Sequence, residues 1–132
     1  MLSPISLAFK KAKNENRPAL LTYTVAGDSS KKQSLEILKA ISNHADILEV
    51  GVPHNTPVAD GGQIQTSAYR AIKNGIKMND IFKIVSDFKK SKNSKPVIFM
   101  GYYNMIFQYG ENNFIKKCKQ SGVNGLIVVD LP

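Results

Sequence analysis

Two hydrophobic patterns alternate along the chain. Short, continuously apolar runs bounded by proline, glycine or polar residues are typical of buried strands. Four such runs are predicted as strands: residues 18–27, 46–51, 95–101 and 124–132. Between these runs, apolar side chains stand three and four residues apart, which is the spacing of one face of a helix.

The helical pattern is clearest in residues 79–92, where four apolar side chains repeat at this spacing: Ile81, Ile84, Val85 and Phe88. Ser3 and Pro4 have the order of an N-cap and a first helical residue, so they predict a helix that runs to about Asn14. The other predicted helices are a segment carrying Leu35, Leu38 and Ile41, residues 61–75, residues 104–109, and a segment with Phe114, Ile115 and Cys118 on one side.

The predicted elements follow the order βαβαβαβ after a leading helix. Apolar strands that alternate with amphipathic helices indicate a parallel sheet covered by helices. Both an open doubly wound sheet and part of a (βα)8 barrel have this order. A nucleotide-binding open sheet is expected to carry a glycine-rich turn after its first strand. The turn here, AGDSSKK, lacks that motif, so the open sheet is the weaker alternative.

Polar side chains gather where the predicted strands end. At or after these carboxyl ends stand Asp28, Glu49, Asp60, Tyr102, Tyr103, Asn104 and Asp130. In a parallel barrel the carboxyl ends of the strands share one face, and that face carries the active site. Asp46 lies at the opposite end of its strand, so the asymmetry is incomplete.

Glu49 interrupts the apolar run of the second predicted strand. Because side chains alternate along a strand, Leu48 and Val50 are expected to point away from the barrel axis if Glu49 points toward it. Burial of an inward carboxyl group raises its pKa, which suits proton transfer near neutrality. The alternative is a structural buried acid that is paired with a basic group.

Asp60 ends a loop that contains Pro53 and Pro57, and both prolines restrict the backbone around them. A stiffened loop of this kind can hold a carboxylate over a pocket. The alternative is that Asp60 caps the following helix, because Asp-Gly-Gly before an amphipathic segment makes a good N-cap.

The composition restricts the class of protein. A chain of 132 residues, 42% hydrophobic and 21% charged, has the size and balance of one soluble globular domain. It contains no apolar run long enough for a transmembrane helix, and its first residues do not have the pattern of a secretory signal. The single cysteine, Cys118, cannot form an internal disulfide, which fits a reducing cytoplasm.

The net charge of +8 raises the question of a nucleic-acid partner. The lysines, however, fall in separate pairs rather than in one stripe: Lys10 with Lys11, Lys31 with Lys32, Lys89 with Lys90, and Lys116 with Lys117. Arginine, which is the usual reader of bases, occurs only at Arg17 and Arg70. A solvated lysine-rich surface is therefore favoured, with no nucleic acid and no membrane as partner.

One stretch, LEVGVPHNTPVADGGQIQ, resembles the signature of the tryptophan synthase alpha chain family. The matching residues are Glu49, Gly51, Pro53, Pro57, Ala59, Asp60, Gly61, Ile64 and Gln65. The segments TYTVAGD, MGYYNMIFQYG and GVNGLIVVDLP are similar to that family as well. The resemblance implies a parallel (βα)8 TIM barrel, of which residues 1–132 form the N-terminal half of a single domain, with a leading helix and roughly the first four βα units.

The resemblance also implies a cytoplasmic lyase of tryptophan biosynthesis. That family cleaves indole-3-glycerol phosphate to indole and glyceraldehyde 3-phosphate in a retro-aldol reaction. By position in the motif, Glu49 matches the catalytic acid and base, and Asp60 matches the residue that binds the indole N–H. Tyr23 and Tyr102 match residues of the substrate pocket; simple packing in the pocket wall is the alternative for both.

The family works with a beta chain that holds pyridoxal phosphate and receives the indole, in an alpha2-beta2 tetramer. Pro53, Pro57 and Asn104 match the region that faces this partner. The chain itself is expected to need no cofactor and to hold no metal, because it has no cluster of metal ligands.

The sequence departs from the family in two places. His54, Asn55 and Thr56 replace a usual aromatic residue followed by Ser-Asp, which affects communication with the partner more than the chemistry, and Gly62 replaces a usual proline. The family match argues against a catalytic role for His54.

The chain is also short for a complete barrel, which takes about 250 residues and binds phosphate after strands seven and eight. We therefore expect the 132-residue chain alone to be inactive or nearly so. The alternatives are a lyase that releases free indole without a beta chain, and a half-barrel that binds a partner or self-assembles without catalysis.

Overall fold

Four strands and six helices make up the computed structural model, which describes residues 1–132. The strands are β1 (Leu21–Val25), β2 (Ile47–Gly51), β3 (Val97–Tyr102) and β4 (Gly125–Val129). The helices are α1 (Pro4–Asn14), α2 (Lys31–Ile41), α3 (Gly62–Lys73), α4 (Met78–Lys89), α5 (Tyr103–Tyr109) and α6 (Glu111–Ser121). Every predicted element is present, although β1 begins later than predicted. No helix is both long and apolar enough to cross a membrane.

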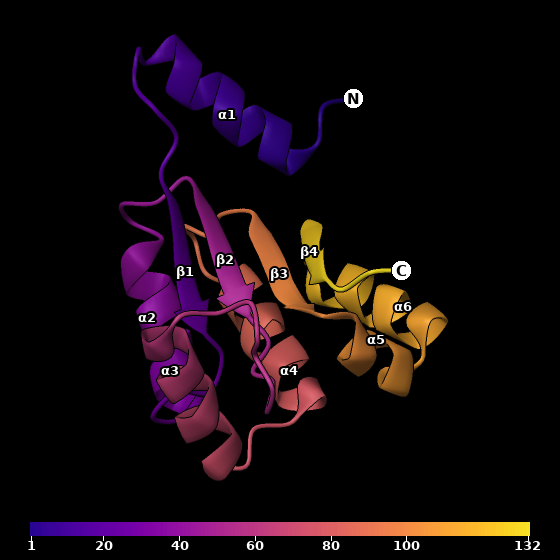
Figure 1. Cartoon of the computed structure of the whole chain (residues 1–132). Coiled ribbons are helices and arrows are strands. Elements are labelled where there is room, and N and C mark those ends of the chain that lie inside the picture. Colours follow the sequence, from indigo (N-terminus) through magenta and orange to yellow (C-terminus); the bar gives the residue numbers. More distant parts are fainter.

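The strands form one parallel sheet in the order β1-β2-β3-β4, as expected for successive βα units (Figure 1). The register aligns Tyr23 with Glu49, and Glu49 with Ile98 on the next strand. Strands β1 and β4 are the two edges of the sheet, and neither has a second neighbour. The predicted parallel α/β fold is confirmed. The four-stranded sheet is not closed into a barrel, because β1 and β4 do not pair with each other.

Helices α2, α4 and α6 cover one face of the sheet and enclose the core with it. The alternation predicted for β2 is confirmed, because Leu48 and Val50 are each 1% exposed and belong to the core cluster. The predicted face of α4 is buried in the same cluster. The prediction for α6 was wrong in part: Phe114 and Cys118 are buried, but Ile115 is 53% exposed.

Helix α1 lies across the amino ends of the strands (Figure 1). It begins as predicted, with Pro4 in the first turn and the Ser3 hydroxyl accepting a hydrogen bond from the Ser6 N–H. Ile5 of this helix reaches Gly125 at the start of β4, so closely that a Cβ atom at Gly125 would lie 2.9 Å from Ile5 Cδ1. The helix thus closes the end of the sheet that lies opposite the predicted site.

Asp46, the one acid at an amino end of a strand, ties the segment after α1 to the start of β2. Its buried carboxylate accepts two hydrogen bonds from the Arg17 guanidinium, at 2.7 and 2.8 Å, and one from the Leu20 N–H at 2.8 Å. The guanidinium holds the pKa of Asp46 well below its usual range. Asp46 therefore has a structural role.

Replacing Asp46 with asparagine is expected to lower the free energy of unfolding by about 1 kcal/mol at pH 7. This is less than for a fully buried pair, because the Arg17 side chain is 39% exposed. A lowered folded-state pKa stabilises the fold above about pH 4 and is lost as the pH falls further, so the difference between the proteins narrows at low pH. Urea unfolding at pH 7 and pH 3 measures this difference in the free energy of unfolding. The control is Asp87→Asn, because Asp87 pairs with two exposed lysines on the surface of α4.

The open edges and the sheet face opposite the helices predict self-association of the 132-residue chain, because unpaired parallel edges recruit further strands. Ile127 lies on that face, in register with Met100, and is 44% exposed. We expect sedimentation equilibrium to show dimers, and Ile127→Lys to shift the chain toward monomers. Ile115→Lys, on the helix side and 53% exposed, is the matched control. A chain that stays monomeric at millimolar concentration contradicts this prediction.

Candidate active site

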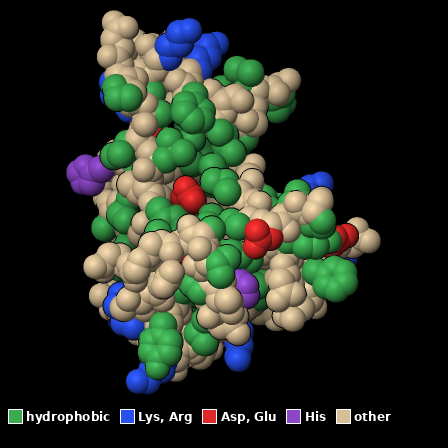
Figure 2. Space-filling model, in the orientation of Figure 1, with side chains coloured by type: hydrophobic (Ala, Val, Ile, Leu, Met, Phe, Trp, Pro, Cys, Tyr) green, Lys and Arg blue, Asp and Glu red, His purple; other side chains and the backbone are tan.

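Glu49 projects from the middle of β2 on the sheet face opposite the core helices. Its direction follows from the strand alternation that buries Leu48 and Val50 against those helices. The side chain is half-buried, and Figure 2 shows acidic side chains standing singly among hydrophobic ones on this side of the molecule. The structure thus turns the one acid of β2 toward the open side of the sheet.

Among residues 1–132, the Glu49 carboxyl group has no hydrogen-bonding partner and no ion pair. Burial alone raises the pKa of its carboxyl group. Residues 1–132 therefore supply no basic partner of the kind that the structural interpretation of Glu49 requires. An unpaired carboxyl group with a raised pKa can donate and accept protons closer to neutrality than an ordinary glutamate.

Tyr23 stands beside Glu49 on β1, and its phenol extends over Gly51 on β2. A Cβ atom at Gly51 would overlap the phenol oxygen, so any larger residue at this position would have to displace the Tyr23 ring. Burial raises the pKa of Tyr23 to about 12, and the nearby charges of Asp60 and Glu49 add to the effect. Tyr23 is therefore a neutral phenol that shares its surroundings with both carboxylates.

Tyr102 ends β3 and connects that strand to the loop that carries Asp60. Its side chain is 3% exposed, and its hydroxyl accepts a hydrogen bond from the Ala59 N–H at 3.0 Å. The same hydroxyl donates to the Asp60 carboxylate at 3.3 Å. Burial raises the pKa of Tyr102, and the charge of Asp60 acts in the same direction.

Asp60 does not cap α3, so that alternative was wrong. The N-cap of α3 is Gly61, and no side chain satisfies the helix at this end. The Asp60 carboxylate instead faces Tyr102, and its backbone carbonyl accepts a hydrogen bond from the Gln65 side chain at 2.8 Å. The structure therefore gathers the four residues predicted for catalysis and substrate binding around one place: Tyr23, Glu49, Asp60 and Tyr102.

The three residues expected to face a partner differ in their exposure to solvent. Pro53 is buried, Pro57 is half-buried and Asn104 is exposed. Pro53 and Asn104 line one groove of about 290 Å³ between the loop after β2, α4 and α5. Phe107, which is 65% exposed, adjoins Asn104 in a neighbouring hollow.

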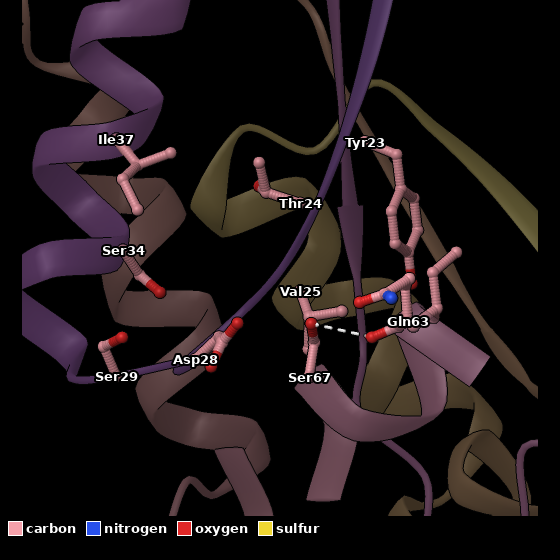
Figure 3. A pocket seen from close by; sticks show the side chains of 10 residues that line it. Tyr23, Thr24, Val25, Asp28, Ser29, Ser34, Ile37, Gln63 and Ser67 are labelled. Carbon is pink, nitrogen blue, oxygen red and sulfur yellow. Dashed lines mark hydrogen bonds between the residues drawn. The ribbon is translucent and has the colours of Figure 1, made fainter. Parts of the chain in front are cut away.

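A separate pocket of about 290 Å³ lies between β1, α2 and α3 (Figure 3). Tyr23 contributes to its wall, but neither Glu49 nor Asp60 does. Asp28 lies at its rim and is held by the Arg70 guanidinium at 2.7 Å. This ion pair lowers the pKa of Asp28 and fixes the turn after β1 to α3.

No group of three or more histidine, cysteine, aspartate or glutamate side chains could hold a metal ion. Both arginines, Arg17 and Arg70, are engaged by carboxylates of the chain itself. Cys118 is buried, and burial raises the pKa of its thiol to about 11. The thiol therefore takes no part in the site.

Two contributors to the site were missed from the sequence. The His54 ring packs against the Tyr102 ring, with 4.7 Å between the ring centroids. The backbone N–H of Ala59 holds the Tyr102 hydroxyl. No local pattern predicts either contact, because Tyr102 is 43 residues from Ala59 in the chain.

Four parallel strands joined by helices, with Tyr23 and Glu49 side by side on the sheet and Tyr102 and Asp60 at the carboxyl ends of its strands, define the class: half of a (βα)8-type barrel. The family model described as "Tryptophan synthase alpha chain" matches residues 9–132. The chain belongs to this family.

Relatives agree with this assignment. The tryptophan synthase alpha chain of Pelagibacter ubique (strain HTCC1062) is 75% identical over 131 residues, which are 99% of this chain and 49% of that protein. The corresponding protein of Pyrococcus furiosus is 45% identical, over 86% of this chain and 46% of that protein. The crystal structure of tryptophan synthase subunit alpha from Legionella pneumophila str. Paris superimposes with a TM-score of 0.94 at 34% identity, over 100% of this chain and 51% of that one. The chain spans about half the length of the relatives it matches.

Glu49→Gln is expected to stabilise the fold at neutral pH. Because burial raises the folded-state pKa of Glu49, ionisation costs stability as the pH rises above about 4. A neutral glutamine removes this cost, so urea unfolding should give the variant the larger free energy of unfolding at pH 7. The two proteins should become equal near pH 3, where Glu49 is protonated.

Glu36→Gln, on the exposed surface of α2, is the control and is expected to show no comparable gain. A Glu49→Gln variant that is less stable than the native chain at pH 7 would show that the carboxylate has a stabilising partner.

Proposed function

We propose that this chain supplies the N-terminal half of a tryptophan synthase alpha barrel, as one part of a single domain. The reaction is the cleavage of indole-3-glycerol phosphate to indole and glyceraldehyde 3-phosphate, a retro-aldol step of tryptophan biosynthesis. The observation that carries the proposal is that an unpaired Glu49, whose pKa is raised, and Asp60 both lie near the Tyr23 phenol.

In this proposal Glu49 is the acid and base. The carboxylic acid first delivers a proton to C3 of the indole ring, which gives an indolenine with a positively charged nitrogen. A carboxylate then takes the proton of the glycerol hydroxyl, and the C–C bond breaks as its electrons return to the ring. A carboxyl group with a raised pKa suits both directions of transfer.

The Asp60 carboxylate accepts a hydrogen bond from the indole N–H and stabilises the positive charge that develops on that nitrogen. A fixed carboxylate that faces a developing cation lowers the barrier electrostatically, without reorganising during the reaction. The phenol of Tyr23, half-buried between the two carboxylates, is suited to line the space for the ring. Tyr102 lies against Asp60, to which its hydroxyl donates a hydrogen bond.

The partner in this proposal is a tryptophan synthase beta chain, which holds the pyridoxal phosphate and receives the indole in an alpha2-beta2 complex in the cytoplasm. One solved structure similar to this chain, at a TM-score of 0.82, concerns the tryptophan synthase a2b2 complex of Pyrococcus furiosus. The groove of Pro53 and Asn104, with exposed Phe107 beside it, gives a partner apolar surface next to the site. Pro57 lies in the same loop.

The phosphate of the substrate needs groups outside these 132 residues. In barrels of this class it is bound by the loops after strands seven and eight. The four strands described here would supply the proton-transfer groups, and the other half of a barrel the anchor for phosphate.

A second candidate function is supported by the open edges of the sheet. A half-barrel with unpaired β1 and β4 could bind a partner or assemble with itself without catalysing a reaction. The two candidates differ in what Glu49 contributes, since assembly does not require a carboxyl group with a raised pKa.

The test is a chimera that joins residues 1–132 to the part of the Pelagibacter ubique protein that this chain does not cover. The 75% identity of the covered part makes this chain compatible with that other half. We expect this chimera to release indole from indole-3-glycerol phosphate and the 132-residue chain alone to release none. Glu49→Gln in the chimera should lower kcat by about 10²- to 10⁴-fold. Adding a beta chain should increase the rate.

Glu36→Gln in the same chimera should keep full activity, since Glu36 lies on the surface of α2. A chimera that folds but releases no indole contradicts the proposed function. A rate that does not rise with the beta chain favours a lyase that releases free indole. Unchanged turnover in Glu49→Gln contradicts the role of Glu49 as acid and base and leaves to this half only the contribution of a structural half-barrel.

A further inference from the structure

The loop between β2 and α3, residues 52–61, carries Asp60 but has few contacts of its own to hold that side chain. Within the loop, the Val58 N–H bonds to the Thr56 carbonyl at 2.9 Å and the Asp60 N–H bonds to the Pro57 carbonyl at 3.0 Å. These bonds fix the backbone in a turn. They do not set the direction of the Asp60 carboxylate.

Tyr102 provides the one hydrogen bond that the Asp60 carboxylate receives. The tyrosine is held firmly, because it is the last residue of β3, is in register with Val129 of β4 and is 3% exposed. Val58 and Ala59 of the loop are exposed, by contrast, and Pro57 and Asp60 are half-buried. Tyr102 is therefore the more deeply buried partner of the pair.

The hydroxyl of Tyr102 is used twice. It donates a hydrogen bond to the Asp60 carboxylate, and its oxygen accepts a hydrogen bond from the Ala59 N–H. A phenol has one hydrogen to donate. A substrate that accepted this hydrogen would have to displace Asp60, so a hydrogen bond from the phenol to the substrate would remove the support of the Asp60 carboxylate.

The ring of Tyr102 holds the other end of the same loop. His54 packs on it with an angle of 58° between the ring planes. One buried side chain therefore contacts both the beginning of the loop, through its ring, and the end of the loop, through its hydroxyl.

We propose that Tyr102 is a positioning residue: its hydroxyl, held between the Ala59 N–H and the Asp60 carboxylate, aims that carboxylate, and its ring anchors His54 at the start of the loop. This rests on the proposed function for the role of Asp60 in catalysis. It assigns Tyr102 a task different from binding substrate and gives His54 a structural one.

The first test measures the loop itself in the 132-residue chain. Tyr102→Phe removes one oxygen atom and keeps the ring. We expect amide hydrogen exchange at Ala59, followed by NMR, to become at least about tenfold faster, while the amides of β3 stay protected. The matched control is Tyr109→Phe, which removes a hydroxyl that donates to Asn79 at 2.7 Å, away from the site. Unchanged exchange at Ala59 overturns the proposal.

The second test measures catalysis in the chimera described above. Tyr102→Phe should lower kcat by about tenfold, because a misdirected carboxylate stabilises the transition state less well, and should change KM by less than about threefold. Tyr109→Phe should change neither. A raised KM with an unchanged kcat would show that Tyr102 binds substrate directly, and an unchanged kcat and KM would show that it only fills space; both overturn the proposal.

His54→Ala gives an independent variant should Tyr102→Phe fail to fold. It is a change at a half-exposed residue, and it should speed exchange in the loop and lower kcat less than Tyr102→Phe does. If the loop amides and kcat are both unchanged, the ring contact does not anchor the loop. A chimera that is inactive with its native Tyr102 refutes the proposed function, whereas the exchange at Ala59 still decides the positioning of the loop.

Discussion

The two-residue alternation of β2 is the constraint on which the rest of this structure depends. Leu48 and Val50 must face α2 and α4 to complete the core, and this leaves Glu49 no other direction than the open side of the sheet. Burial of the strand then supplies the electrostatics, because the carboxyl group loses water without gaining a partner. Core packing and the chemistry of the site therefore come from the same five residues.

Parallel pairing extends this constraint to the neighbouring strands. Tyr23 is brought beside Glu49 by the register of β1, and Tyr102 is brought to the same edge by β3. The long connections between parallel strands are free to vary, so the loop after β2 can carry Asp60 back over the ends of the strands. The sheet provides fixed positions, and one loop provides the second carboxylate.

Much of this arrangement could be predicted from the sequence. The apolar runs predicted the four strands, and the alternation predicted the direction of Glu49, because both depend on neighbours in the chain. The partners of Asp60, Asp46 and Asp28 could not be predicted, because each lies at least 26 residues away and depends on how the elements pack. The same reason explains Ile115, where helical spacing alone did not distinguish the covered side of α6 from the solvent side.

The contact between Tyr23 and Gly51 links two positions that are 28 residues apart in the sequence. The phenol occupies the space that any side chain at position 51 would need. A larger residue at 51 would therefore have to displace the Tyr23 phenol, while a smaller residue at 23 would release the restriction. A change at position 51 is therefore expected to be tolerated best after a change at position 23, and the two positions are expected to vary together among homologues.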